Sequence, residues 1–320
     1  MEKIPNEQGG FHMNTALNPE SSFETRTVAP VERILCPVDF SEISGKAYRY
    51  AQSISGHYHA KLLVQHVVEL WQHPSADYSI SPDILEDFRR SLISNAEKEL
   101  QHFVKTAGGP QPECLVEESV APDAVLFLAR ERAISLIVLG THGRRGFDHL
   151  MLGSVTERVL RHASCPVLVI PRTAPTPVGP NVTDDSVSVQ RILCCVDFSA
   201  HSQCALKHAF SLADAYGAEV TVLHVLDGIP ESADVGQETA AAMENLQTLL
   251  PAAAGKGTHA HLEVRMGKAY PEILRFAAES RPDVIVAGVR GINALNLAVF
   301  GSTLYRVIQL SSVPVLAVPI

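Results

Sequence analysis

The sequence predicts an α/β fold that is present in two copies. Two segments of the chain are almost identical: residues 33–41 read RILCPVDFS, and residues 191–199 read RILCCVDFS. In each copy, short apolar runs rich in Val, Ile and Leu alternate with longer segments of helical periodicity. This alternation is typical of a parallel sheet with right-handed crossovers and helices on both faces. A length of 320 residues also suits two domains better than one or three.

The elements of the first copy follow from its apolar pattern. We expect strands at 33–38, 62–68, 113–117, 136–140 and 167–170, and helices at 44–58, 82–104, 122–131 and 154–162. The first helix, for example, places Ala47, Tyr50, Ala51 and Ile54 at helical spacing. The second copy repeats this order, and its last strand is expected at 314–319.

The domain boundaries follow from composition. Residues 1–30 are polar and contain no apolar block, so we expect a disordered N-terminal tail without a secretory signal. Residues 173–188 form a Pro-rich linker, which favours an extended spacer. The first domain is therefore expected at 31–172 and the second at 189–320, named copy 1 and copy 2 below. The sequence of copy 1 is longer around residues 71–82, and we expect this insertion to form a loop over its ligand site.

Composition excludes several classes of protein. A hydrophobic content of 46% is enough for packed cores, so wholesale disorder is excluded. A formal net charge of -9 disfavours nucleic-acid and membrane partners. No apolar run reaches the length of a membrane span, and we expect a cytoplasmic protein. The 6 cysteines are too sparse for a disulfide scaffold and are expected to be reduced core thiols.

A glycine pattern with the same spacing follows the fourth strand of each copy. Its form is Gly-x2-Gly-x9-Gly-Ser, with Gly140, Gly143, Gly153 and Ser154 in copy 1 and Gly288, Gly291, Gly301 and Ser302 in copy 2. Glycines allow positive φ and let backbone N–H groups approach an anion closely. The start of the following helix adds free N–H groups and its positive dipole end, which favours a phosphate chain. The serines stand where an N-cap hydroxyl would, so capping and phosphate binding both remain open.

An aspartate ends the first strand of each copy. Asp39 and Asp197 are each followed by Phe-Ser, and they either cap the next helix or contact a ligand. In open α/β sheets, ligands bind beyond the carboxyl ends of strands where the strand order reverses. A carboxylate beside a phosphate loop accepts hydrogen bonds from ribose hydroxyls or an adenine amine. Walker A and G-x-G-x-x-G patterns do not occur, which sets those nucleotide-binding classes aside.

With these residues assembled, the chain resembles a tandem universal stress protein of the ATP-binding branch. The resemblance covers both halves and rests on three features of copy 1: the segment Pro37-Val38-Asp39-Phe40-Ser41, the glycine pattern, and residues 165–171, which read CPVLVIP. It implies two Rossmann-like domains of the adenine nucleotide alpha hydrolase type, each with a five-stranded parallel sheet of order 3-2-1-4-5. Its last strand mediates antiparallel pairing, so the two copies are expected to form a pseudo-dimer within the chain. A homodimer of chains stays open.

The resemblance also implies the ligand and its contacts. The ligand is ATP, with or without Mg²⁺; no catalytic residue and no protein-bound metal are expected. Asp39 would contact the adenosine, the end of the second strand (Val64, His66, Val67) would line the base, and Arg144 or Arg145 would pair with the phosphates. The expected ATP-binding residues are Pro37, Val38, Asp39, His66, Val67, Gly140, Thr141, His142, Gly143, Arg144, Arg145, Gly153, Ser154, Val155 and Thr156. A weaker second site would use Asp197, Val225, Gly288, Gly291, Gly301, Ser302 and Thr303.

Two details remain open in this interpretation. His66 and His224 are either packed core residues or ligands, whereas His142 is expected to be exposed near the phosphates. The function that follows is ATP binding in a stress response, with nucleotide-dependent conformation or partner choice as its output. The alternatives are slow ATP hydrolysis and a nucleotide-free interaction scaffold.

Overall fold

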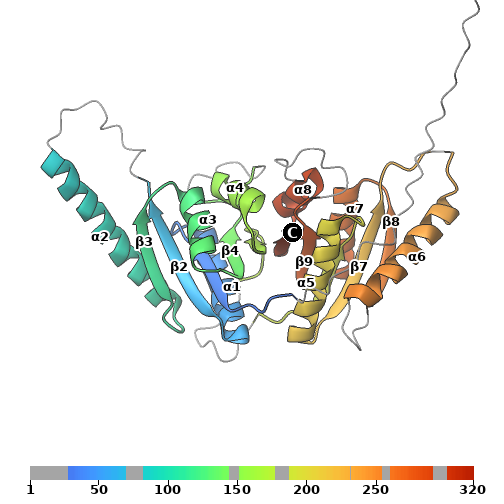
Figure 1. The fold of residues 1–320 in the computed structure, drawn as a ribbon, viewed down its shortest axis with the longest axis horizontal. Helices are drawn as coiled ribbons and strands as arrows, with labels where there is room; N and C mark the ends of the chain where they lie inside the picture. Colours follow the sequence, from blue (N-terminus) through green and yellow to red (C-terminus); the bar gives the residue numbers. More distant parts are fainter. Residues whose placement is uncertain are drawn as a thin grey trace, which may run out of the picture.

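The computed structural model describes residues 28–69, 82–143, 151–176, 187–230, 232–253, 260–290 and 301–320. Within these residues the fold is α/β, as predicted, and its strands form one ten-stranded sheet of order β3-β2-β1-β4-β5-β10-β9-β6-β7-β8 (Figure 1). Several predicted features lie wholly or partly outside the described residues: residues 1–27 of the expected tail, residues 177–186 of the linker, residues 71–81 of the copy 1 insertion, Arg144, Arg145 and Gly291.

The bounds of the elements are as follows. Copy 1 contains β1 (Arg33–Pro37), α1 (Glu42–Tyr58), β2 (Lys61–Val68), α2 (Pro82–Ala107), β3 (Glu113–Glu118), α3 (Ala121–Glu131), β4 (Leu136–Gly140), α4 (Ser154–His162) and β5 (Val167–Ile170). Copy 2 contains β6 (Arg191–Cys195), α5 (Ala200–Tyr216), β7 (Glu219–Leu226), α6 (Val235–Ala253), β8 (Ala260–Met266), α7 (Ala269–Ser280), β9 (Val284–Gly288), α8 (Ser302–Leu310) and β10 (Val315–Val318).

Each copy contributes a parallel half of the sheet. The order within copy 1 is β3-β2-β1-β4-β5, and copy 2 repeats it as β8-β7-β6-β9-β10, so the implied order 3-2-1-4-5 is confirmed in both. The direction of winding reverses between β1 and β4, because β2 lies on one side of β1 and β4 on the other. The carboxyl ends of β1 and β4 are therefore the place where a ligand is expected in this type of sheet.

The two halves join through their last strands. β5 and β10 pair antiparallel, and Leu168 lies opposite its own counterpart Leu316. The predicted pairing within the chain is thus confirmed, and an approximate two-fold axis passes between these two leucines. Because β5 and β10 pair with each other, neither is an edge strand. The two edge strands of the sheet are β3 and β8.

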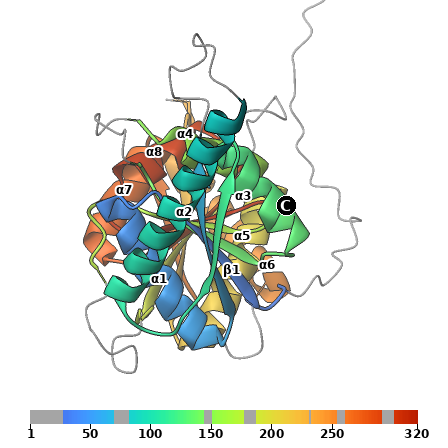
Figure 2. The same ribbon diagram turned by 90° about the vertical axis from the view of Figure 1, so that its left-hand side faces the viewer.

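Helices cover both faces of the sheet. One hydrophobic cluster joins α1, α2, α5 and α6 to one face, with Tyr48, Leu100, Phe210 and Leu246 in its core. The second cluster joins α3, α4, α7 and α8 to the other face. The helices α2 and α6 lie at opposite ends of the molecule, and Figure 2 views it from the α2 end.

Local sequence signals explain where α1 and α5 begin. The Ser41 hydroxyl accepts a bond from Ser44 N at 3.2 Å, and Ser199 caps α5 through Ser202 N at the same distance. Helix α1 therefore starts at Glu42 rather than at the predicted residue 44.

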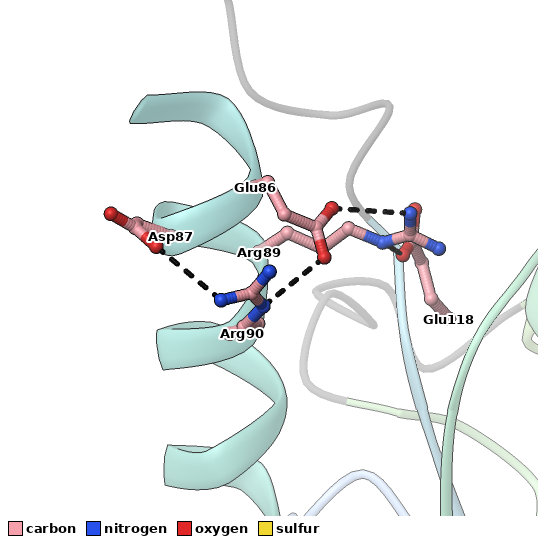
Figure 3. Close-up of polar contacts among 5 residues, drawn as sticks. All are labelled: Glu86, Asp87, Arg89, Arg90 and Glu118. Carbon is pink, nitrogen blue, oxygen red and sulfur yellow. Dashed lines mark hydrogen bonds and ion pairs between the residues drawn. The ribbon is translucent and has the colours of Figure 1, made fainter. Parts of the chain in front are cut away.

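Ion pairs hold the outer helix α2 against the sheet. Arg89 pairs with Glu118 at the end of β3, whereas Arg90 pairs with Glu86 and Asp87 on the helix itself (Figure 3). The pairs within the helix are largely exposed, so each contributes at most about 1 kcal/mol to stability, whereas the Glu118 side chain is only 18% exposed.

All six cysteines are free thiols, and Cys36, Cys165 and Cys194 are buried. Burial raises the pKa of the Cys165 thiol to about 12, so this group is protonated and unreactive at neutral pH. None of the helices in the described part of the chain is both long and apolar enough to cross a membrane.

Candidate functional site

The structure brings together the two motifs that the sequence singled out in copy 1. Asp39 follows β1, and Gly143 follows β4 by three residues. A Cβ atom added to Gly143 would lie only 2.5 Å from Asp39 Oδ2. Glycine at this position therefore permits a backbone-to-carboxylate contact that an L side chain would prevent.

Asp39 is held by a tight turn. Its Oδ1 accepts hydrogen bonds from Ser41 N at 3.1 Å and from Ser41 Oγ at 2.6 Å. The intervening Phe40 adopts φ 62°, a left-handed conformation that is uncommon for a bulky residue. Copy 2 repeats the whole arrangement, with Phe198 at φ 63° and the same two distances from Ser199 to Asp197. Since such a conformation is costly, its presence in both copies indicates that the position of the carboxylate is a requirement of the fold.

The glycines serve close packing rather than unusual backbone angles. None of Gly140, Gly143, Gly153, Gly288 and Gly301 adopts positive φ, so that part of the prediction is wrong. A Cβ atom at Gly140 would lie 2.3 Å from the Ile43 side chain, and one at Gly288 would lie 2.7 Å from the backbone of His201. These glycines let α1 and α5 approach the ends of β4 and β9.

Helix α4 begins with a cap that has no side chain. Its N-cap is Gly153 and Ser154 is the first residue of the helix, so of the two roles left open for Ser154 the structure excludes capping. The first intrahelical bond runs from Glu157 N to Gly153 O at 2.9 Å. The N–H groups of residues 154–156 donate to no acceptor within the described residues. These donors lie next to Gly143, because a Cβ atom at Gly153 would be 3.7 Å from Gly143 N.

A buried polar network supports this helix start. Thr156 donates through its hydroxyl to Gly140 O at 2.7 Å, and Gly153 N donates to Thr141 O at 2.8 Å. Thr141 is itself buried, and its hydroxyl contacts His142 Nδ1 at 3.0 Å. His142 is half-buried, with Nε2 inaccessible and unpartnered among the described residues. The expectation of an exposed His142 is therefore wrong, because its ring turns toward Thr141.

A polar pair that was not predicted lies near this site. Gln65 on β2 is fully buried, and its Nε2 donates to Glu117 on β3. Its Oε1 has no partner within the described residues. Gln65 lies opposite Pro37 in the register, and its backbone oxygen accepts from Val38 N at 2.8 Å, so the pair lies near the carboxyl end of β1. The available signal was one glutamine inside the apolar run KLLVQHVV.

The two histidines at the strand ends make packing contacts within the protein. His66 Nδ1 lies 2.8 Å from Val38 O, and its ring stacks on Phe40 with centroids 4.2 Å apart. His224 makes the equivalent 2.8 Å contact with Val196 O in copy 2. Side chains alternate along a strand, so His66 lies on the opposite face of β2 from Gln65 and Val67.

Copy 2 keeps the scaffold of the site but changes its chemistry. Ser302 is again the first residue of a helix with a glycine N-cap, Gly301, and Thr303 follows. Val289 and Leu304 stand where copy 1 has Thr141 and Thr156, and Leu223 replaces Gln65. The polar network of copy 1 is therefore replaced by apolar packing.

Copy 2 also places different charges at the carboxyl ends of its strands. Burial, and then the positive charge of Arg290, lower the pKa of His201, and the Asp197 carboxylate opposes this shift. Arg290 replaces His142 of copy 1, so copy 2 has a permanently charged guanidinium at this position. Val225 is half-buried at the end of β7. Across the described ranges of both copies, no cluster of three or more His, Cys, Asp or Glu could hold a metal ion.

Comparisons with known proteins agree with this architecture. The family model described as "Universal stress protein family" matches residues 30–171 and 188–319. A universal stress protein of Mycolicibacterium smegmatis is 24% identical over 295 residues, which cover 89% of this chain and 96% of the relative. One from Thermus aquaticus is 32% identical over 137 residues, covering 43% of this chain and 96% of its own length.

Among solved structures, a universal stress protein from Archaeoglobus fulgidus has the same fold over nearly its whole length. Its TM-score is 0.64 at 22% identity, covering 91% of this chain and 99% of that chain. A functionally unknown protein from Pseudomonas aeruginosa has a TM-score of 0.60 at 19% identity, covering 90% and 92% of the two chains. The chain therefore belongs to the universal stress protein family and carries one family domain in each half.

Proposed function

We propose that copy 1 binds an adenine nucleotide and that this nucleotide is ATP. The observation that carries the proposal is the glycine-capped start of α4, where three backbone N–H groups have no acceptor among the described residues. Such a helix start binds anions through its N–H groups and its dipole. A serine or threonine N-cap would use one of these donors, and glycine leaves them available.

Other side chains of copy 1 are proposed to contact the ribose and the adenine base of the nucleotide. Asp39, held by Ser41 and lying against Gly143, is placed to accept hydrogen bonds from ribose hydroxyls or the adenine amine. The half-buried side chains of Pro37 and Val67 offer apolar contact for the base. The unpartnered Oε1 of Gln65 adds a buried acceptor near the end of β1. Arg144 and Arg145, outside the described residues, are proposed as charge partners of the phosphates.

Copy 2 is proposed as the weaker site. It keeps Asp197, Gly288, Gly301, Ser302 and Thr303, but Leu304 and Val289 remove the hydroxyls that brace the helix start in copy 1. We propose that nucleotide bound in copy 1 alters the conformation or partner choice of the protein during a stress response in the cytoplasm. Binding without turnover suffices for this role.

The serines that begin α4 and α8, Ser154 and Ser302, offer a matched test of the proposal. Ser154→Asp places a negative charge at the start of α4, where it favours the helix dipole and repels phosphate. Ser302→Asp makes the same change in copy 2, and both side chains are exposed. Small molecules released from the gently denatured proteins are identified by mass spectrometry, and the ATP-dependent shift in melting temperature is recorded.

We expect adenine nucleotide and a melting shift from wild type and from Ser302→Asp, and much less of both from Ser154→Asp, in which only the weaker copy 2 site remains. A wild-type protein that releases no adenine nucleotide and shows no shift with ATP would overturn the proposal. Equal binding by Ser154→Asp and wild type would place the phosphates elsewhere.

A further inference from the structure

A cavity lies between the two copies, beside the paired strands β5 and β10. It has a volume of about 110 Å³. It is lined by Leu168 and Leu316 on the paired strands and by side chains of helices α1 and α5. Leu136 and Val284, which line it, stand at the start of β4 and β9. The cavity is therefore at the opposite end of these strands from the candidate nucleotide site, and it is a separate feature of the fold.

The lining of the cavity follows the approximate two-fold axis. Ile54 and Tyr58 of α1 face it together with their counterparts Leu212 and Tyr216 of α5. The apolar surface is continuous with the hydrophobic cluster that joins both copies. The ends of the two helices also touch directly, because the His57 ring stacks on Tyr216 with centroids 3.8 Å apart. A molecule in this cavity would contact both halves of the chain at once.

The two-fold symmetry of the lining breaks at two polar pairs, Tyr50 with His208 and Ser135 with Asp283. Tyr50 on α1 corresponds to His208 on α5, and both line the cavity. The Tyr50 hydroxyl is used within the protein, because it donates to Pro175 O at 2.9 Å. The Asp283 carboxylate, a further lining residue, accepts from Gln190 N and Arg191 N through Oδ2 at 2.8 and 2.9 Å.

His208 has no hydrogen-bond partner among the described residues. Burial lowers its pKa to about 4, so the ring is neutral at physiological pH. A neutral imidazole offers one N–H donor and one acceptor. The cavity thus combines apolar walls with a neutral imidazole that has no partner within the described part of the chain, and the hydroxyl-bearing residues Tyr58, Ser211 and Tyr216 also line it. Apolar walls with a few polar groups are common in small-molecule sites.

We propose that this interdomain cavity binds a small neutral aromatic molecule with one hydroxyl group, such as a phenol. At about 110 Å³ the cavity is somewhat smaller than an engineered apolar cavity of about 150 Å³ in another protein that binds benzene, so one ring is the largest unit that it would take. The hydroxyl hydrogen-bonds to His208, and the ring contacts the paired aliphatic and tyrosine side chains. A carboxylate is disfavoured, because it would lose its hydration beside Asp283.

Binding of phenol to the full chain tests the proposal directly. Titration calorimetry at neutral pH should show saturable binding of phenol, weaker binding of benzene and none of benzoate. The same phenol binding is expected with and without ATP, so this test is independent of the proposed nucleotide function. Absence of saturable phenol binding by the wild-type protein would overturn the proposal.

Two variants locate the site. Leu212→Phe fills the cavity and should abolish phenol binding, whereas Leu310→Phe makes the same change at an exposed position on α8 and should leave it intact. His208→Leu should weaken phenol binding by about fivefold and leave benzene binding unchanged, because it removes one hydrogen bond. The assignment would be contradicted if Leu212→Phe bound phenol as tightly as wild type does. It would also be contradicted if His208→Leu lost affinity for phenol and for benzene to the same extent.

Discussion

A side chain at Gly143 should weaken nucleotide binding through Asp39. In Gly143→Ala the added Cβ would lie 2.5 Å from Asp39 Oδ2, where ordinary contact begins at 3.4 Å. The carboxylate must therefore retreat by about 0.9 Å, and the turn that holds it opposes this movement. Its Oδ1 is bonded to Ser41 N and Oγ at 3.1 and 2.6 Å, so the retreat stretches or breaks these bonds.

The expected loss follows from the contacts that Asp39 would make. Hydrogen bonds to a charged group contribute about 1.5–3 kcal/mol each, so losing one weakens ATP binding roughly 10- to 100-fold. Titration calorimetry of ATP against wild type and Gly143→Ala measures this ratio. The melting temperature of the variant without ligand shows whether the fold is intact.

Gly56 provides the control for this experiment. A Cβ atom at this position in α1 would meet nothing within 4 Å. Gly56→Ala should therefore stabilise the helix by about 0.5–1 kcal/mol and leave the dissociation constant for ATP unchanged. Unaltered ATP affinity in Gly143→Ala would refute the role given to Asp39, since the displaced carboxylate would then have no part in binding.

Two further predictions concern stability. Gly288→Ala places a Cβ atom 2.7 Å from the backbone of His201, so helix α5 must shift; we expect a loss of about 1–3 kcal/mol in urea unfolding, and no loss would contradict the packing role of this glycine. Burial lowers the pKa of His208 from 6.5 to about 4, so the unfolded state binds a proton that the folded state does not. Stability should fall by about 2 kcal/mol more between pH 7 and pH 5 in wild type than in His208→Leu, and equal pH slopes would exclude this effect.

Most of the fold could be predicted because its signals are local and occur twice. The bounds of β4, α4 and β5 agree with the expected ranges, since Gly and Pro mark their ends and the apolar runs are short. The pairing of β5 with β10 was implied by resemblance to the family rather than by the apolar pattern. The start of α1 was placed late, because Ser41 was not recognised as its cap.

The position of the candidate site could be predicted from the sequence, but only some of its contacts could. The approach of Gly143 to Asp39 follows from topology, because β1 and β4 end side by side. The pair Gln65 and Glu117 depends on the register between β2 and β3, which the pattern of apolar residues does not specify. The left-handed backbone conformation of Phe40 could not be predicted either, because it depends on the hydrogen bond from Ser41 N to the Asp39 carboxylate.

We propose above that copy 1 is the nucleotide site and that Asp39 is part of it. The most direct test of this proposal is ATP titration calorimetry on the full chain with Asp39→Asn and, as the matched control, Asp197→Asn. Asparagine keeps the Oδ1 acceptor for the following serine but removes the charge, so both turns should remain intact. We predict that Asp39→Asn loses most of the ATP affinity and that Asp197→Asn retains the wild-type value. Loss in Asp197→Asn with full binding in Asp39→Asn, or no binding of ATP to the wild-type chain, would contradict the claim.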